Sequence, residues 1–152
     1  MTLLATLDHA DADLTACLAR VMAAVLKPGD VIALQGAVGA GTGMSAFGFK
    51  GGIGSASRRL VIEGETRHLA VLVQANFGRA GDLVLPDGRR PDPRQPALPE
   101  RGSVIVILAT DVAVDQRQLQ RICRRAGAGL ARLGAFWGNG SGDVVLGFTT
   151  AN

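Results

Sequence analysis

The stretch PALPERGSVIVILATD, Pro96–Asp111, passes from a proline-rich loop through Gly102 and Ser103 into an unbroken apolar run. A short run of apolar and β-branched residues that follows turn-forming residues is typical of a buried strand. Glycine and serine commonly mark turns, so a serine at the start of a strand has an ordinary structural explanation. The alternative is that the Gly102–Ser103 bond is itself a chemical site, and the local pattern leaves both interpretations open.

The composition indicates one compact globular domain. The chain has 152 residues, of which 47% are hydrophobic and 19% charged, enough to bury a sizeable core. Its net charge of +3 comes from scattered basic residues that are not interleaved with aromatic ones, which argues against nucleic-acid binding. No apolar stretch is long enough to span a membrane, and the first residues do not have the pattern of a signal peptide. The sequence therefore predicts no membrane association and a cytoplasmic location.

The cysteines and histidines form no recognisable site. Cys17 and Cys123 are far apart and outside any CxxC or Cys/His spacing, which argues against a zinc site and a disulfide framework. His9 and His68 lie in no Ser/His/Asp arrangement and are interpreted as structural. We therefore expect no metal and no cofactor.

Hydrophobic periodicity and turn residues predict an α/β order with no internal repeat. Helices are expected within 11–30 and at about 115–133, and strands at 30–36, 58–64, 68–76, 82–88, 103–111 and 143–152. The glycine-rich segment 36–54 should be loop-like or tightly packed, and its part 39–54 should pack beside the strand that begins at Ser103. The segment 89–102 carries four prolines among charged residues and is typical of an exposed linker. Five arginines of the second helix lie opposite its apolar face, where a solvated outer surface explains them better than phosphate binding: Arg117, Arg121, Arg124, Arg125 and Arg132.

A glycine-rich passage near the N-terminus, KPGDVIALQGAVGAGTG, has part of the pattern of a phosphate-binding loop. Gly36 and Gly41 fit GxxxxGK[ST], but Thr42 and Gly43 occupy the positions of the lysine and the hydroxyl. Residues 4–41 resemble the TsaE-type ATPase of bacterial tRNA threonylcarbamoyladenosine biosynthesis. Without the groups that neutralise phosphate and bind magnesium, we expect no ATP binding.

Four later motifs, in order, resemble those of one peptidase family. They are GAGTGMSAFGFKGGIGSASR, VLVQANFGR, RGSVIVILATD and GLARLGAFWGNGSGDVVLGFTTAN. They are similar to motifs of the DmpA-type peptidases, which include L-aminopeptidase/D-esterases and β-peptidyl aminopeptidases. Family members are much longer, so the resemblance implies an α/β fold that is a truncated portion of a layered αββα sandwich, of the DmpA/ornithine acetyltransferase type. The two resemblances divide the chain into an ATPase-like part, 1–38, and a partial peptidase domain, 39–152.

The resemblance gives the serine at the strand start a chemical role. Family members cut their own chain between glycine and serine at the motif matched by Gly102–Ser103. Attack by the Ser103 hydroxyl on the preceding carbonyl is an intramolecular step favoured by proximity, and Gly102 has no side chain to obstruct it. After hydrolysis, the new α-amine, whose ordinary pKa is about 8, serves as the base for the hydroxyl of the same residue. Chemistry of this kind needs no histidine.

Three further residues match site positions of the family. Ser141 and Asp143 match a Ser-x-Asp/Glu pair that orients the nucleophile and its amine. Asn76 matches an asparagine that donates a hydrogen bond to the tetrahedral oxyanion. From the residues alone, turns explain Asn139, Ser141 and Asp143, and a strand-end turn explains Asn76. A tyrosine that the family supplies to the site has no counterpart, because the chain contains no tyrosine.

The resemblance therefore implies a self-processing N-terminal serine aminopeptidase, in truncated form, that hydrolyses short peptides, amides or esters with a free amino terminus. It also implies a homo-oligomer and no cofactor. The alternatives are a P-loop ATPase-like protein of tRNA modification and a non-catalytic fragment. If the first interpretation holds, Ser103, Asn76, Ser141 and Asp143 should converge around one pocket, with Ser103 at the first position of a central strand and exposed apolar surface nearby.

Overall fold

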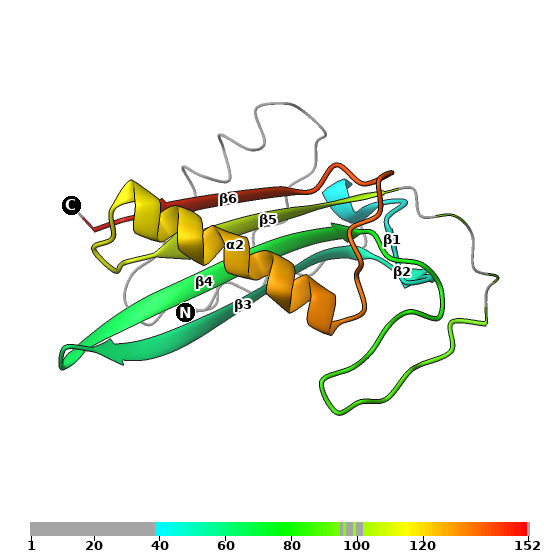
Figure 1. Cartoon of the computed structure of the whole chain (residues 1–152), viewed down its shortest axis with the longest axis horizontal. Helices are drawn as coiled ribbons and strands as arrows, with labels where there is room; N and C mark the ends of the chain where they lie inside the picture. Colours follow the sequence, from blue (N-terminus) through cyan, green and yellow to red (C-terminus); the bar gives the residue numbers. More distant parts are fainter. Residues whose placement is uncertain (1–38, 95, 97–98, 100–101, 152) are drawn as a thin grey trace.

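The computed structural model describes residues 39–94, 96, 99 and 102–151, which form a four-stranded sheet with a helix across one face (Figure 1). The sheet order is β3-β4-β5-β6. Strand β4 is antiparallel to both of its neighbours, β3 and β5, whereas β5 and β6 are parallel. The elements are η1 (Gly39–Gly41), β1 (Ser45–Ala46), β2 (Phe49–Lys50), β3 (Gly52–Ile62), β4 (Glu65–Asn76), β5 (Ser103–Thr110), α2 (Gln116–Arg132) and β6 (Val144–Thr149).

Strands β3 and β4 form a long hairpin. Its turn residues Glu63 and Gly64 have φ angles of 53° and 81°, the pair of positive values that a type I′ turn requires. The predicted strands at 58–64 and 68–76 are confirmed, but β3 begins at Gly52, inside the glycine-rich segment. The ladder runs without a break from Ile62↔Glu65 to Gly52↔Ala75, so pairing with β4 overrides the low strand preference of glycine.

The strand predicted at 82–88 is wrong. The backbone there bonds to the end of the helix region instead of to a strand: the Val84 N–H donates to the carbonyl of Leu133 at 3.0 Å. The turn at its end is confirmed, because the Gly88 N–H donates to the Leu85 carbonyl at 2.8 Å. This apolar segment is therefore an irregular connection that packs against the core.

The helix predicted at about 115–133 is confirmed as α2, Gln116–Arg132. Asp115 caps it by accepting from the Gln118 N–H at 2.7 Å, while the Gln118 side chain accepts from the Asp115 N–H at 2.9 Å. This reciprocal capping box satisfies two N–H groups at the helix start. The five arginines occupy exposed positions, as expected for a solvated outer face. No helix in the described part of the chain is long and apolar enough to cross a membrane.

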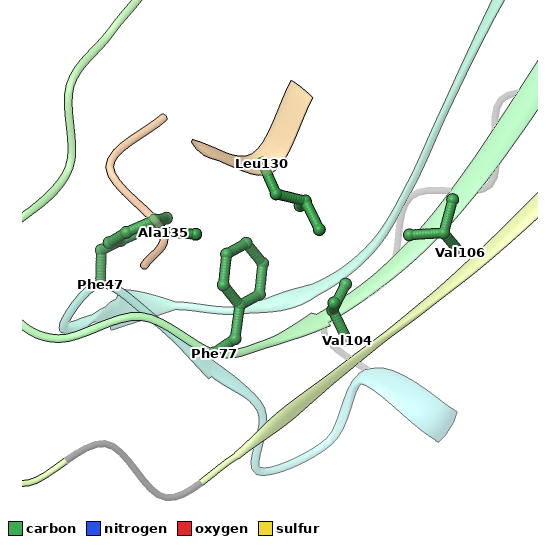
Figure 2. Packing of buried hydrophobic residues seen from close by; sticks show 6 residues of the cluster. All are labelled: Phe47, Phe77, Val104, Val106, Leu130 and Ala135. Carbon is green, nitrogen blue, oxygen red and sulfur yellow. The ribbon is translucent and has the colours of Figure 1, made fainter. Parts of the chain in front are cut away.

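The main core lies between α2 and the sheet (Figure 2). Its buried members are Phe47, Phe77, Val104, Val106, Leu130 and Ala135. Because successive residues of a strand point to opposite faces, Val104 and Val106 face the α2 layer while Ser103 and Ile105 face the other side. That other face carries a smaller cluster of Leu72, Ile107 and Ala109.

Candidate active site

Three of the predicted site residues are brought together where β5 begins. Ser103 is the first residue of β5, one of the two inner strands of the sheet. Antiparallel pairing places it opposite Asn76, the last residue of β4. On the other side, Gly102 forms a parallel bridge with Ser141. Pairing on both sides of one strand therefore gathers Asn76, Ser103 and Ser141 at one end of the sheet.

The Ser103 hydroxyl is held in a half-buried position beside the peptide bond that precedes it. Its Oγ accepts a hydrogen bond from the Gly142 N–H at 3.2 Å and donates to the Gly102 carbonyl oxygen at 2.8 Å. Because the Gly142 N–H occupies one lone pair of this oxygen, the hydroxyl proton is directed toward the Gly102 carbonyl. The oxygen is thus next to the carbonyl group that a self-cleaving attack would use.

Asp143 fixes the loop that supplies this donor. Its Oδ1 accepts from the N–H of Val104, the residue after Ser103, at 3.0 Å, and also from the Ser141 hydroxyl. A carboxylate bonded to a backbone N–H forms one of the stronger hydrogen bonds in proteins. The 141–143 loop is therefore tied to the start of β5 on both sides of Gly142, and the Ser-x-Asp pair lies beside Ser103 as predicted.

Asn76 lies opposite Ser103 but its side chain is bonded elsewhere. Its Oδ1 accepts from the N–H of Ser45 in β1, at 3.1 Å. Directly opposite residues of antiparallel strands have Cβ atoms about 5 Å apart, so the Asn76 amide is within side-chain reach of Ser103. The glycine-rich segment thus meets the site through Asn76: β4 separates it from β5, whereas the sequence predicts direct packing beside the Ser103 strand.

Gly102 has a steric reason to be glycine. A Cβ at this position would lie 2.0 Å from the Asn76 carbonyl oxygen, a distance that no real side chain tolerates. From the sequence, glycine at this position is expected to leave the Gly102 carbonyl open to attack. The structure adds that the backbone of β4 passes so close to residue 102 that any other residue would push the two strands apart.

Exposed apolar side chains surround the site on its own face of the sheet. Ile105, Val144 and Leu146 expose 41%, 53% and 45% of their surface. Parallel pairing puts Val144 beside Ile105, two residues from Ser103. The exposed apolar surface expected near the site is therefore present.

An apolar cavity lies on the opposite face of the sheet. It has a volume of about 520 Å³ and lies between α2 and the β1–β4 region, with Phe47, Phe49 and Leu130 among its lining residues. Ser103 points to the other side of the sheet, so its hydroxyl does not open into this cavity.

The segment that resembles a phosphate-binding loop lies mostly outside the described residues. Where the chain is described, Gly39–Gly41 form a single 3₁₀ turn and β1 begins at Ser45, so no helix N-terminus follows to bind phosphate. The Lys50 ammonium donates to the carbonyls of Gly41, Met44 and Gly51 at 2.8, 3.1 and 2.7 Å. The Lys50 ammonium therefore joins the 41–44 turn to β2 and is already occupied by backbone carbonyls.

His68 lies at the far end of the sheet from the site. Its Nδ1 is 2.7 Å from Oδ2 of Asp111, and its N–H donates to Oδ1 at 2.6 Å. Burial raises the pKa of Asp111, but the hydrogen bonds from His68 outweigh it and bring the pKa below its ordinary value. Asp111 follows β5 by one residue and is about 26 Å from Ser103 along the strand.

The other histidine and the cysteines are not part of this pair. His9 and Cys17 lie outside the described residues. Burial raises the pKa of the free Cys123 thiol.

Sequence reasoning missed the backbone groups of the site. The N–H groups of Gly142, Val104 and Ser45 make the hydrogen bonds that organise Ser103, Asp143 and Asn76. A backbone donor has no side-chain signature. The only signal was the glycine between Ser141 and Asp143, which permits close approach of the loop to the Ser103 hydroxyl.

Curated relatives share this part of the chain. Two proteins named β-peptidyl aminopeptidase BapA match, one from Sphingosinicella microcystinivorans at 41% identity over 136 residues and one from Sphingosinicella xenopeptidilytica at 38% over 137. Each match covers 78% of this chain, but only 34% and 33% of the relative. The chain thus spans about a third of the length of the curated relatives it matches.

Solved structures confirm the predicted fold class. A protein of Pyrococcus horikoshii OT3 superposes with a TM-score of 0.68 at 51% identity, covering 78% of this chain and 33% of that one. The L-aminopeptidase D-Ala-esterase/amidase of Ochrobactrum anthropi, described as a new variant among the Ntn hydrolase fold, superposes with a TM-score of 0.65 at 39% identity. That match covers 80% of this chain and 34% of the other.

The family model of Peptidase family S58 matches residues 6–152. It therefore also spans most of the segment that resembles an ATPase, and none of these comparisons supports the ATPase resemblance. The four motifs, the pairing that gathers them and the match over nearly the whole sequence agree. The chain belongs to Peptidase family S58.

Proposed function

We propose that this chain carries the nucleophile and its supporting groups of an N-terminal serine aminopeptidase, with Ser103 as the nucleophile. The observation that carries the proposal is the set of hydrogen bonds around Ser103: its Oγ accepts from Gly142, while Asp143 accepts from Val104. These two hydrogen bonds from backbone N–H groups fix the position of the Ser103 hydroxyl relative to the loop that carries Asp143. The ATPase alternative lacks support from both the loop geometry and the comparisons.

The first reaction in the proposal is self-cleavage. The Ser103 Oγ attacks the Gly102 carbonyl carbon, and the Asn76 amide donates a hydrogen bond to the oxyanion that forms. The C–N bond then breaks, the hydroxyl proton passes to the nitrogen, and the acyl group is left on the oxygen as an ester. Water then hydrolyses the ester, which leaves a carboxylate on Gly102 and a free amine and hydroxyl on Ser103. The short Oγ to carbonyl-oxygen distance supports this step, because the attacking atom starts beside its target.

The second reaction uses the new N-terminus. The α-amine accepts the hydroxyl proton while Oγ attacks the carbonyl of a substrate, and the tetrahedral oxyanion accepts a hydrogen bond from the Asn76 amide. Asp143, already bonded to the Ser141 hydroxyl, attracts the ammonium groups of enzyme and substrate. We propose short peptides, amides or esters with a free amino terminus as substrates, a class consistent with the curated β-peptidyl aminopeptidases.

We propose that 39–152 form a partial peptidase domain, in which 89–102 is the exposed linker before the cleaved bond. Among the described residues between 89 and 99, those at 89, 90, 92, 94, 96 and 99 are exposed and those at 91 and 93 are half-buried, which suits a segment whose end is released. Cytoplasmic location and homo-oligomeric assembly stay predictions.

Intact mass spectrometry tests the proposal. Purified protein kept for a day at mildly alkaline pH should yield one fragment ending at Gly102 and one beginning at Ser103. Ser103→Ala should stay intact, whereas Ser57→Ala, a serine of β3, should cleave like the unmodified chain. Hydrolysis of an amino acid p-nitroanilide by the cleaved protein would then show the second reaction. Persistent full-length mass in the unmodified chain, or cleavage in Ser103→Ala, would contradict the proposal.

A further inference from the structure

We propose that the β1–β2 hairpin is a positioning element, in which the backbone N–H of Ser45 sets the orientation of the Asn76 amide. This inference rests on the proposed function, because it concerns how the oxyanion donor is aimed. It assigns a purpose to the glycine-rich segment 39–54, which lies outside the set of residues proposed to take part in the chemistry.

The direction of the amide follows from donor chemistry. A backbone N–H can only donate, so the atom of Asn76 that faces Ser45 must be the oxygen, and the contact is 3.1 Å. In a planar amide the NH₂ group points away from the partner of the oxygen. Among the described residues, Nδ2 forms no hydrogen bond, and Asn76 lies opposite Ser103 in the β4–β5 ladder. The donor is therefore left available on the side of the nucleophile.

The Ser45 N–H is free to act in this way. In the hairpin, the Gly51 N–H donates to the Met44 carbonyl at 2.9 Å. Pairs in an antiparallel ladder alternate between bonded and non-bonded, so at the next pair, Ser45↔Lys50, the N–H groups point outward. The Ser45 N–H is consequently directed at β4, and its loss would remove no hydrogen bond between β1 and β2.

Buried contacts hold the hairpin in place on both sides of Asn76. The Phe47 N–H donates to the Phe77 carbonyl at 3.1 Å, and the two rings meet edge to face with centroids 5.2 Å apart. Phe47 is only 3% exposed, and Figure 2 shows its ring in the same cluster as that of Phe77. A Cβ on Gly51 would lie 2.5 Å from the Ala75 carbonyl oxygen. Residues 75 and 77, which flank Asn76, are therefore both in contact with the hairpin.

The test compares Ser45→Pro, which removes the N–H, with Ser45→Ala, which retains it. We expect Ser45→Pro to lower the rate constant of self-cleavage by about tenfold or more, since small misplacements of catalytic groups have large effects. Ser45→Ala should cleave at least several times faster than Ser45→Pro. In an Asn76→Ala background, which itself should cost about 10²-fold, Ser45→Pro should cause no further loss.

Two outcomes separate this inference from the proposed function. If Asn76→Ala cleaves as fast as the unmodified chain, the oxyanion role of Asn76 in the proposed function fails. If Asn76→Ala is slow but Ser45→Pro adds its full effect to it, the oxyanion role stands and the positioning role is overturned.

Hydrogen exchange provides a readout that needs neither cleavage nor the proline variant. The amide of residue 45 should exchange slowly in the unmodified chain and in Asn76→Asp, whose carboxylate still accepts, and faster in Asn76→Ala. Asn76→Asp should nevertheless cleave slowly, because it lacks the N–H donor. An exchange rate at residue 45 that is the same in Asn76→Ala as in the unmodified chain would overturn the inference.

Discussion

The two ends of β5 are built from similar parts. At the start of the strand, the Asp143 carboxylate accepts from a backbone N–H and from the Ser141 hydroxyl, in the loop whose backbone also donates to the Ser103 hydroxyl. At its end, the Asp111 carboxylate accepts from the His68 N–H and lies beside the His68 imidazole. Thr110 adds a hydroxyl there, so this end has an acid, a histidine and a hydroxyl, the composition of a hydrolase triad.

The hydroxyl groups show why only one end is suited to chemistry. Thr110 is 5% exposed, and its Oγ1 donates to the His68 carbonyl at 2.7 Å, so the imidazole has no hydroxyl proton to take. Thr110 Oγ1 also accepts from the Val112 N–H at 3.2 Å, so a backbone donor on the hydroxyl does not distinguish the two ends. What distinguishes Ser103 is that it is half-buried and that its proton faces the carbonyl of the residue directly before it, Gly102. A triad is recognised by geometry and not by composition. The end without a histidine is the one whose hydroxyl is arranged to react.

The largest expected effect concerns which end takes part in self-cleavage. Asp143→Ala removes the acceptor of the Val104 N–H and of the Ser141 hydroxyl, and it frees the loop that carries the Gly142 N–H. We expect the rate constant of self-cleavage to fall about 10²-fold. His68→Gln, at the far end, should change it by less than twofold.

Mass spectrometry over time, with circular dichroism to verify the fold, measures both variants. Slow cleavage in His68→Gln would break the comparison, because it would show that the far end contributes to the reaction.

The second prediction concerns crowding at the start of β5. Gly102→Ala places a Cβ against the Asn76 carbonyl oxygen, so the strands must separate, and we expect the free energy of unfolding to fall by about 2 kcal/mol. Gly129→Ala is the matched control, because Gly129 is exposed on α2 with nothing within 4 Å of the added Cβ. There alanine should raise the free energy of unfolding by up to about 1 kcal/mol.

Urea denaturation of both glycine variants provides the measurement. Equal stability of Gly102→Ala and the unmodified chain would mean that the two strands are not in close contact at this point.

The smallest effect belongs to the far end and depends on pH. Because His68 lowers the pKa of Asp111 in the folded state, the ionised carboxylate stabilises the fold above its unfolded pKa of about 3.9. This contribution is lost as the pH falls through the lower folded pKa. Asp111 is about a third exposed, so Asp111→Asn should lower the free energy of unfolding at neutral pH by less than about 1 kcal/mol.

Urea denaturation at neutral pH and again in strong acid should show the difference between Asp111→Asn and the unmodified chain decreasing with pH. A difference that is constant or that grows in acid would contradict this assignment.

Sequence patterns predicted the elements whose contacts are local. The start of α2 is fixed by two residues three positions apart, Asp115 and Gln118, and its faces by periodicity. Strand β5 was readable as an apolar run, and the turn at 86–88 from Pro-Asp-Gly. The segment 82–88 was misread as a strand because its partner, Leu133, is distant in sequence, and the start of β3 was missed because β4 and not glycine determines it.

The sequence by itself determined which side chains we propose for the site, since the motifs point to Ser103, Ser141, Asp143 and Asn76. Only the tertiary structure decided how they are held. The bonds of Gly142 to Ser103 and of Val104 to Asp143 each join residues 39 positions apart, and that of Ser45 to Asn76 spans 31. All three donors are backbone N–H groups, which every residue except proline carries. No residue type signals where such a donor points, because its direction is set by strand pairing across the folded sheet.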